Sequence, residues 1–326
     1  MKQELSKKLS KSVDMDFESL PNFRTVVPGK LYRSSTVDNV TPNDVEKLSS
    51  LGIKTIVDLR SMEELNESSA PRLLDNTFQI VGVEVKDRKP LAPELHFTVK
   101  DAASRQDKRH FFVAFYNRQF LTGTLQRRPW YQRVFAILTM ILAFLLDTIL
   151  RTNRKYLKKA TVAIILTDKG ILQWYKDMVD YSTGSMFAAL SILSDPQNQP
   201  ALLCCKHGKD RTAIVAALVL GILGRKKQDV IEDYHKSEEG TKSMYQMMYN
   251  DVCVRFGAQE SYLWARKETM QQFLEYIDEK YVIHRLIFKP ESTCTVLQCK
   301  SHFCHSSFQL LDETVRSVAL AERTKG

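Results

Sequence analysis

The sequence predicts an α/β fold in which a central, mostly parallel sheet is flanked by helices. Three short apolar segments, rich in branched residues, are typical of buried strands: residues 55–59, 78–85 and 200–204. Helical segments separate them along the chain, and strands connected through helices pair in parallel. Ligands of such sheets bind beyond the carboxyl ends of the strands. The residues that follow each strand are therefore the first candidates for a functional site.

The helices are predicted from their end signals. The first has Thr41 as its N-cap, Pro42 at the first helical position and Gly52 beyond its last residue. Later helices are expected over residues 170–194, 212–223, 226–235 and 262–281, with Gly224 and Gly240 as breaks.

The length of 326 residues exceeds that of a usual domain, but the chain has no internal repeat and no low-complexity linker. We expect one domain over residues 21–285, with an apolar helical insertion at about 120–160. An N-terminal extension (1–20) and an irregular tail (286–326) flank it. The tail carries cysteines and histidines, but their spacing matches no common zinc site.

The charge balance favours anionic partners. Lysine and arginine number 47 against 38 acidic residues, a net charge of +9, which suits phosphorylated lipid headgroups or acidic membranes. The chain lacks zinc-finger and RNA-binding signatures, so we expect no nucleic-acid partner. Six cysteines do not form a disulfide framework in a chain of this size, and the first residues lack the apolar core of a signal peptide. We therefore expect a cytoplasmic protein.

Residues 204–212 carry the clearest functional motif, Cys-Cys-Lys-His-Gly-Lys-Asp-Arg-Thr. Five residues separate Cys205 from Arg211, enough for the backbone to curl into a semicircle whose amides point inward and bind an anion. The apolar run that follows predicts a helix, whose N-terminus favours both a bound phosphate and a Cys205 thiolate. Arg211 is a planar, two-pronged donor that matches two phosphoryl oxygens. The motif therefore predicts a phosphate site with a nucleophile at its centre.

The chemistry expected of this site is phosphate ester hydrolysis. Cys205 would attack phosphorus and form a phosphocysteine that water then cleaves. The other loop residues expected to contact the substrate are Lys206, His207, Gly208, Lys209 and Thr212. Two lysines supply more charge than one monophosphate needs, which favours a phosphorylated inositol ring. We expect neither a metal nor another cofactor.

The loop resembles the signature of cysteine-dependent phosphatases. Its Gly-Lys-Asp-Arg-Thr sequence is similar to the loop of the atypical branch of the protein-tyrosine-phosphatase superfamily, whose members act on phosphotyrosine and phosphoinositides. Other segments occur in the order that this family uses, namely residues 22–24, 29–35, 41–48 and 51–61. The resemblance spans about residues 22–281 and implies a protein-tyrosine-phosphatase-like fold with a helical lid. Two alternatives are a strict protein-tyrosine or dual-specificity phosphatase and a non-catalytic pseudophosphatase that binds phosphorylated ligands.

A phosphatase of this kind needs an acid that protonates the leaving group. Asp87, just beyond a predicted strand, is our first choice, although it could also be a solvated loop residue. Asp210, inside the loop, is the rival; its other role would be a salt-bridged carboxylate that holds the loop. Arg33 and Arg60 are each expected to make a second phosphate contact or a structural ion pair. Asp58 is interpreted as a buried hydrogen-bond acceptor.

Two residues depart from the pattern of the family. Cys204 stands where histidine is usual, and Ala213 stands where glycine is usual. Neither change removes the nucleophile or Arg211. Cys204 or Cys253 could trap an oxidised Cys205 as a disulfide, although adjacent cysteines form one only with strain. A redox or sulfur-transfer protein that uses a cysteine loop at a strand end is a further alternative.

Residues 130–150 are the most apolar part of the chain, with basic residues on both sides. The uncharged run of thirteen residues, 134–146, is shorter than the roughly twenty that a spanning helix needs. A helix that lies on a membrane surface or covers the active site is favoured, and a core helix is the alternative. The expected partners are thus phosphorylated lipid headgroups or phosphotyrosine proteins, with peripheral membrane contact through residues 130–150.

Overall fold

The computed structural model describes residues 16–66, 70, 72–86, 93–99, 107–152, 154–165 and 170–281. A seven-stranded sheet with the order β1-β2-β7-β3-β6-β4-β5 forms its centre. Its strands are β1 (Arg24–Val27), β2 (Leu31–Ser34), β3 (Thr55–Asp58), β4 (Gln79–Lys86), β5 (Glu94–Val99), β6 (Arg109–Phe112) and β7 (Ala201–Cys204). The five inner strands are parallel, and only the edge strands β1 and β5 pair antiparallel. The predicted fold class is confirmed.

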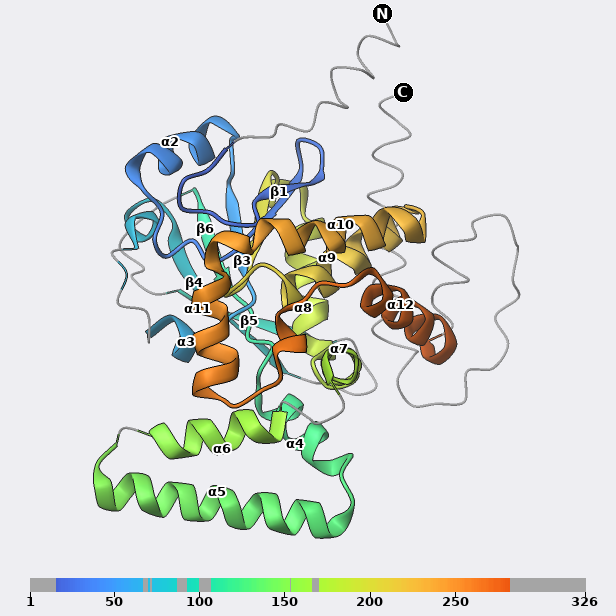
Figure 1. The fold of residues 1–326 in the computed structure, drawn as a ribbon. Helices are drawn as coiled ribbons and strands as arrows, with labels where there is room; N and C mark the ends of the chain where they lie inside the picture. The colour runs from blue at the N-terminus through green and yellow to red at the C-terminus, as the bar shows by residue number, and fades with distance from the viewer. Residues whose placement is uncertain are drawn as a thin grey trace, which may run out of the picture.

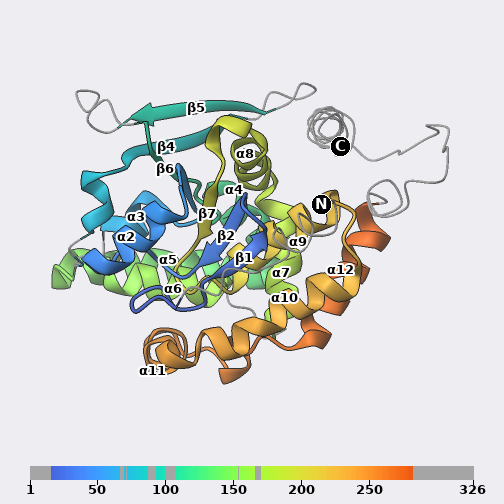
Figure 2. The same cartoon turned by 90° about the horizontal axis from the view of Figure 1, so that it is seen from above.

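Helices cover both faces of this sheet (Figures 1 and 2). They are α2 (Pro42–Ser50), α3 (Met62–Asn66), α4 (Arg118–Gln126), α5 (Trp130–Leu150), α6 (Lys155–Ile165), α7 (Gly170–Tyr181), α8 (Thr183–Ser194), α9 (Asp210–Ile222), α10 (Lys227–Gly240), α11 (Tyr245–Tyr249) and α12 (Lys267–Tyr281). Short helical turns are η1 (Leu73–Asn76), η2 (Pro196–Asn198), η3 (Lys242–Met244), η4 (Asn250–Arg255) and η5 (Glu260–Leu263).

The sheet separates two apolar clusters, because alternate side chains of a strand point to opposite faces. Ile56, Leu202 and Cys204 pack toward α2 in the smaller cluster. Val57 and Leu203 belong to the larger cluster, which includes residues of α7, α8, α9, α10 and α12. Figure 2 shows α2 on one side of the central strands and α8 and α9 on the other.

Several sequence-based element boundaries were wrong. The helix expected over residues 170–194 is divided at Ser182, a buried residue whose hydroxyl donates to the carbonyl of Phe115 at 2.8 Å. The last expected helix begins at Lys267 rather than at residue 262, because residues 260–263 form the short turn η5. The strands β1, β2, β5 and β6 were not predicted.

The apolar insertion expected at about 120–160 is helical. It contains α4 and a hairpin made of α5 and α6, which projects from the body of the molecule with α5 outermost (Figure 1). Two arginines stabilise the base of the hairpin. Arg127 pairs with Asp177 of α7 at 2.8 Å, and Arg128 donates to the carbonyl of Ile164 in α6 at 2.7 Å. Most large apolar side chains of α5 are exposed, so the alternative of a core helix is wrong.

The contact between α4 and α7 at the base of the hairpin depends on a glycine. A Cβ atom at Gly123 would overlap the ring of Tyr181. We therefore expect Gly123→Ala to lower the free energy of unfolding by about 1–3 kcal/mol, the usual effect of overpacking. Thermal unfolding followed by circular dichroism measures this change.

Gly82→Ala is the matched control, because a Cβ atom there meets the carbonyl oxygen of Thr98 at an ordinary 3.7 Å. Equal melting temperatures for the two variants would contradict the proposed role of Gly123.

Candidate active site

The phosphate loop connects β7 to α9, so Cys205 lies at the carboxyl end of a central strand, as expected. Cys205 is 2% exposed. Gly208 has a φ of 64°, and a Cβ atom there would overlap the backbone of Ser34. Only glycine combines this left-handed conformation with so close an approach of two backbones.

The carbonyl groups of the loop are held from outside. The amide of Thr36 donates to the carbonyl of Lys206 at 3.2 Å. The side chain of Asn22 donates to the carbonyl of Gly208 at 2.9 Å. In a planar peptide the N–H points away from the C=O. The loop amides that follow these carbonyls therefore point to the opposite side of the loop, which is the orientation that an anion-binding nest needs.

Arg33 completes this anchoring. Its guanidinium donates to the carbonyl of Gly208 at 2.7 Å and pairs with Asp233 of α10 at 2.5 Å. Arg24 binds the same carboxylate at 2.8 Å. Arg33 is fully buried by these contacts. Of the two roles expected for Arg33, the structure therefore supports the structural ion pair.

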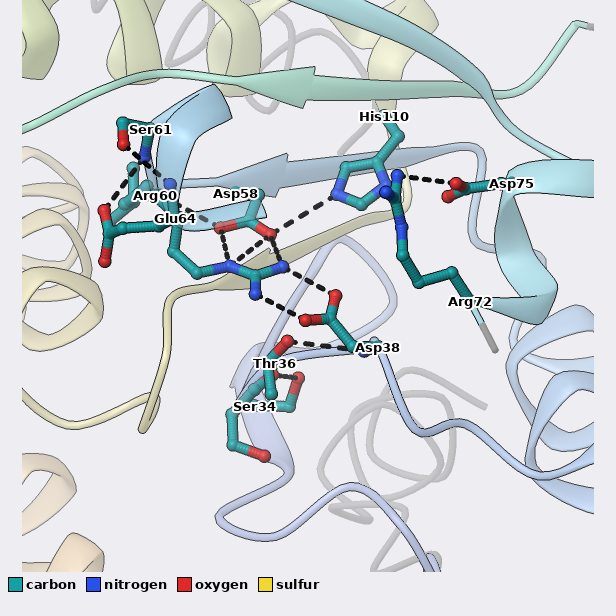
Figure 3. Close-up of polar contacts among 12 residues, drawn as sticks. Ser34, Thr36, Asp38, Asp58, Arg60, Ser61, Glu64, Arg72, Asp75 and His110 are labelled. Atoms are coloured by element: carbon teal, nitrogen blue, oxygen red, sulfur yellow. Dashed lines mark hydrogen bonds and ion pairs between the residues drawn. The ribbon is translucent and has the colours of Figure 1, made fainter. Parts of the chain in front are cut away.

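Arg211 is oriented by Glu64 of α3. The two terminal nitrogens of Arg211 donate to the two carboxylate oxygens of Glu64 at 2.9 and 3.0 Å, and Nη1 also donates to the carbonyl of Leu59 at 3.1 Å. Glu64 accepts from the amide of Ser61, and the Ser61 hydroxyl accepts from the amide of Glu64 (Figure 3). Burial alone would raise the pKa of Glu64, but Arg211 outweighs it and holds the pKa below its ordinary value.

Tyr116 lies against the other side of this arginine, with the guanidinium carbon 4.5 Å from the centre of its ring. Tyr116 follows β6 and stacks on Trp174 of α7. Sequence reasoning missed both Glu64 and Tyr116. A signal for Glu64 was present, because Ser61-Met-Glu-Glu64 is a capping box directly after a buried strand.

Arg60 and Asp58 form a buried network (Figure 3). Arg60 pairs with Asp58 and with Asp38, each at 2.6 Å, and all three residues are at most 5% exposed. Burial by itself would raise the pKa of Asp58, but Arg60 and His110 hold it well below its usual range. The structure gives Arg60 the role of a structural ion pair, and Asp58 is the buried acceptor that the sequence indicated.

The two loop lysines have different positions. Lys206 pairs with Asp251 of η4 at 2.6 Å, and its side chain is 39% exposed. Lys209 is 1% exposed and donates to the carbonyls of Tyr262 and Trp264 at 2.8 and 3.1 Å. The ammonium of Lys209 therefore faces the interior, which is not the substrate-facing position expected from the sequence.

Asp210 also has structural partners. Its carboxylate pairs with Lys209 at 2.9 Å and accepts from the hydroxyl of Tyr175 at 2.7 Å. The Tyr175 hydroxyl in turn lies 2.9 Å from that of Tyr234. These contacts match the loop-holding role. Asp87 lies outside the described residues, one position beyond Lys86 at the carboxyl end of β4.

His207 and Thr212 are both at the loop. Burial, together with the charge of Lys206, lowers the pKa of His207 to about 4, so the imidazole is neutral at physiological pH. The hydroxyl of Thr212 is buried without a hydrogen-bond partner among the described residues. It belongs to the first turn of α9, directly after Arg211.

The three cysteines in the described part of the chain are free. Cys204 lies in the smaller apolar cluster and Cys205 in the larger one, on opposite faces of the sheet. Burial raises the pKa of the Cys204 thiol well above its usual value. Cys253 packs against a third cluster formed by Met244, Met248 and Leu263. A direct Cys204–Cys205 disulfide would require one of the two side chains to leave its core.

The loop between β7 and α9 thus carries a cysteine at its beginning and an arginine at its end. The model of the tyrosine phosphatase family matches residues 16–284, and the chain belongs to this family. A solved structure, the core catalytic domain of the PP-IP phosphatase SIW14 from S. cerevisiae in complex with citrate, is similar over 82% of this chain and 96% of that chain. The sequences are 13% identical, and the TM-score is 0.33. The search of curated proteins found no match.

The pairing of Glu64 with Arg211 leads to a pH-dependent prediction. Because the pKa of Glu64 lies below its ordinary value of 4.5, its ion pair stabilises the fold above that value and is lost as the pH falls through the folded-state pKa. We expect Glu64→Gln to lower kcat on an aryl phosphate about tenfold, as one charge-assisted pair is lost. The difference in melting temperature from wild type is expected to be largest at neutral pH and to shrink under acidic conditions.

Glu46→Gln, on the exposed side of α2, is the control and should change neither quantity. A melting difference for Glu64→Gln that does not vary with pH would show that the charge of Glu64 is not what stabilises the loop.

Proposed function

We propose that this phosphatase hydrolyses phosphate monoesters through a phosphocysteine intermediate. The observation that carries the proposal is the anchoring of the loop carbonyls by Asn22, Arg33 and Thr36. We infer that the amides on the opposite side of the loop face Cys205. A phosphoryl group bound by those amides has its phosphorus next to the sulfur. The fixed donors stabilise the charge that develops during attack.

Arg211 supports the same reaction. A guanidinium has five N–H donors. In the described contacts, both N–H groups of Nη1 and one of Nη2 are used by Leu59 and Glu64. The remaining Nη2–H and the Nε–H lie on one edge of the planar group, the edge that binds two oxygens of one phosphate. Glu64 therefore selects which edge of Arg211 faces the substrate.

The reaction then has two steps. The Cys205 thiolate bonds to phosphorus while the ester P–O bond breaks, and the leaving oxygen takes a proton from a carboxylic acid. Water next attacks the phosphocysteine, releases inorganic phosphate and regenerates the thiolate. We assign the acid role to Asp87, since β4 ends at the same edge of the sheet as β7 and since Asp210 is already engaged by Lys209 and Tyr175.

Phosphoinositides are the favoured substrates. The partly exposed Lys206 and the net charge of +9 both favour a substrate with several negative charges. Lys209 does not add to this argument, because its ammonium is buried against backbone carbonyls. Phosphotyrosine is the second candidate, and membership of the tyrosine phosphatase family favours it.

Phosphate release from a panel of phosphoinositides, phosphotyrosine peptides and an aryl phosphate tests this function. Wild type should release phosphate fastest from phosphoinositides, and Cys205→Ser should release none. Lys206→Gln should slow phosphoinositide turnover about tenfold, the effect of one charge-assisted contact, and slow the aryl phosphate much less.

Lys242→Gln is the matched control, because Lys242 of η3 also pairs with an acidic residue, Glu239, but is not part of the loop. Equal losses on all substrates for Lys206→Gln would overturn the lipid preference. Tight binding of phosphorylated ligands without any phosphate release would instead establish a pseudophosphatase.

The assignment of the acid is tested by varying the leaving group. Asp87→Asn should lower kcat about 10²–10⁴-fold for an alkyl phosphate, whose leaving group needs a proton, and far less for p-nitrophenyl phosphate. Asp210→Asn should reduce both activities to a similar extent and lower the melting temperature, since it weakens the contact with Lys209. A loss that depends on the leaving group in Asp210→Asn, and not in Asp87→Asn, would reverse the assignment.

A further inference from the structure

The α5–α6 hairpin carries an unusual surface for a water-exposed element. Of the seventeen large apolar side chains that are exposed in the described residues, twelve lie on α5. They include Trp130 and Phe135 near its beginning and Ile149 near its end, each at least 73% exposed. The buried positions of α5 are only Ala136, Ala143 and Asp147. A helix that is apolar on nearly all sides is normally buried in a protein core or in lipid.

The charges around this surface have one sign. Residues 127–165 contain eight basic residues and one acidic residue, Asp147. Asp147 is buried between the two helices, where its carboxylate accepts from the amides of Tyr156 and Leu157 at 3.0 and 2.8 Å. Arg151 and Lys155, in contrast, are exposed at the tip of the hairpin. An apolar surface bordered by cations is complementary to a membrane that contains anionic lipids.

The connectivity excludes a helix that crosses the membrane, although α5 is long and apolar enough by length and composition. At 1.5 Å per residue, α5 measures about 31 Å and could cross a bilayer, but the eleven residues of α6 span only about 16 Å. The segments on either side of the hairpin, α4 and α7, pack against each other. Both ends of the hairpin therefore lie on the same side of the membrane.

We propose that the α5–α6 hairpin docks the protein on anionic membranes, with α5 lying in the plane of the interface. Figure 1 shows α6 between α5 and the body, so the free side of α5 faces away from the protein. Figure 1 also places α3 and α4, which follow the carboxyl ends of β3 and β6, on the side of the body that bears the hairpin. The phosphate loop belongs to that same edge of the sheet. Where the proposed phosphoinositide activity holds, docking brings the site to its substrate.

Sedimentation with lipid vesicles tests the docking, using full-length protein that carries Cys205→Ser so that no turnover complicates the measurement. Vesicles of phosphatidylcholine are compared with vesicles that also contain phosphatidylserine. We expect binding to both, and stronger binding when phosphatidylserine is present. Leu138→Glu with Leu142→Glu should weaken binding at least about tenfold, because two exposed leucines on one face of α5 can then no longer enter the apolar layer.

Matched variants separate docking from general effects. Phe97→Glu with Val99→Glu places the same charges on two other exposed apolar positions, on the edge strand β5, and should leave binding unchanged. Leu138→Ile with Leu142→Ile should retain binding. An unchanged melting temperature of the Leu138→Glu with Leu142→Glu variant, relative to its parent, shows that the fold is intact.

A second pair of variants tests the attraction between the basic residues of the hairpin and anionic lipids. Arg151→Gln with Lys155→Gln should lower binding to phosphatidylserine vesicles about tenfold and leave binding to pure phosphatidylcholine unchanged. The control is Lys226→Gln with Lys236→Gln, which should not change binding. Lys226 caps α10 and Lys236 lies within it, and Figure 1 shows α10 on the side of the body opposite the hairpin.

Three results would overturn the proposal: no binding to either vesicle, equal binding of the Leu138 and Leu142 glutamate variant, or a wild-type dimer that this variant dissociates without any vesicle binding. The last result would identify a second copy of the chain as the occupant of α5. Vesicle binding is measured on Cys205→Ser and phosphate release on the wild type, so the two proposals can fail separately. A protein that binds no vesicles can still be a phosphatase, and one that releases no phosphate can still bind vesicles.

Discussion

The shape of the phosphate loop depends on the buried guanidinium of Arg33. This side chain links three separate parts of the fold, because it projects from β2, pairs with Asp233 of α10 and donates to the carbonyl of Gly208. A buried charge is costly unless it is paired with an opposite charge. Arg33 has these partners only when β2, α10 and the loop are all in place. The orientation of the loop amides, on which the proposed phosphate binding depends, is thus tied to the complete fold of the domain.

The loop itself could be predicted from sequence because its information is local: a cysteine, a glycine and an arginine at fixed spacing between a strand and a helix. The residues that orient it could not, since they come from distant segments. Glu64 reaches Arg211 from α3, and Asn22 reaches the loop from the segment before β1. Lys209 illustrates the opposite error. Its position in the loop suggested a phosphate contact, but two carbonyls near the beginning of α12 accept its ammonium donors instead.

The predicted strands likewise differ from the missed ones in whether their pattern is local or depends on contacts with distant segments. The apolar strands β3 and β7 have the pattern of buried central strands, and each lies within one or two residues of its expected boundaries. In β2, however, Arg33 and Ser34 are polar and still fully buried, because Arg33 is paired and the hydroxyl of Ser34 donates to the carbonyl of Ser35. Buried polar residues such as these conceal a strand from any reading of hydrophobic periodicity.

Asp147 explains why an apolar segment of this length forms a hairpin. In the sequence it interrupts the apolar run and argues against a spanning helix. In the structure it lies in the last turn of α5, and its carboxylate accepts from the first backbone amides of α6 and from the hydroxyl of Thr152. An unpaired carboxylate in an apolar layer is strongly unfavourable, but one that satisfies the amides of a helix N-terminus is stable there. The single acidic residue of the segment therefore fixes the turn, and the turn keeps α5 packed on α6, with its exposed side facing away from the body.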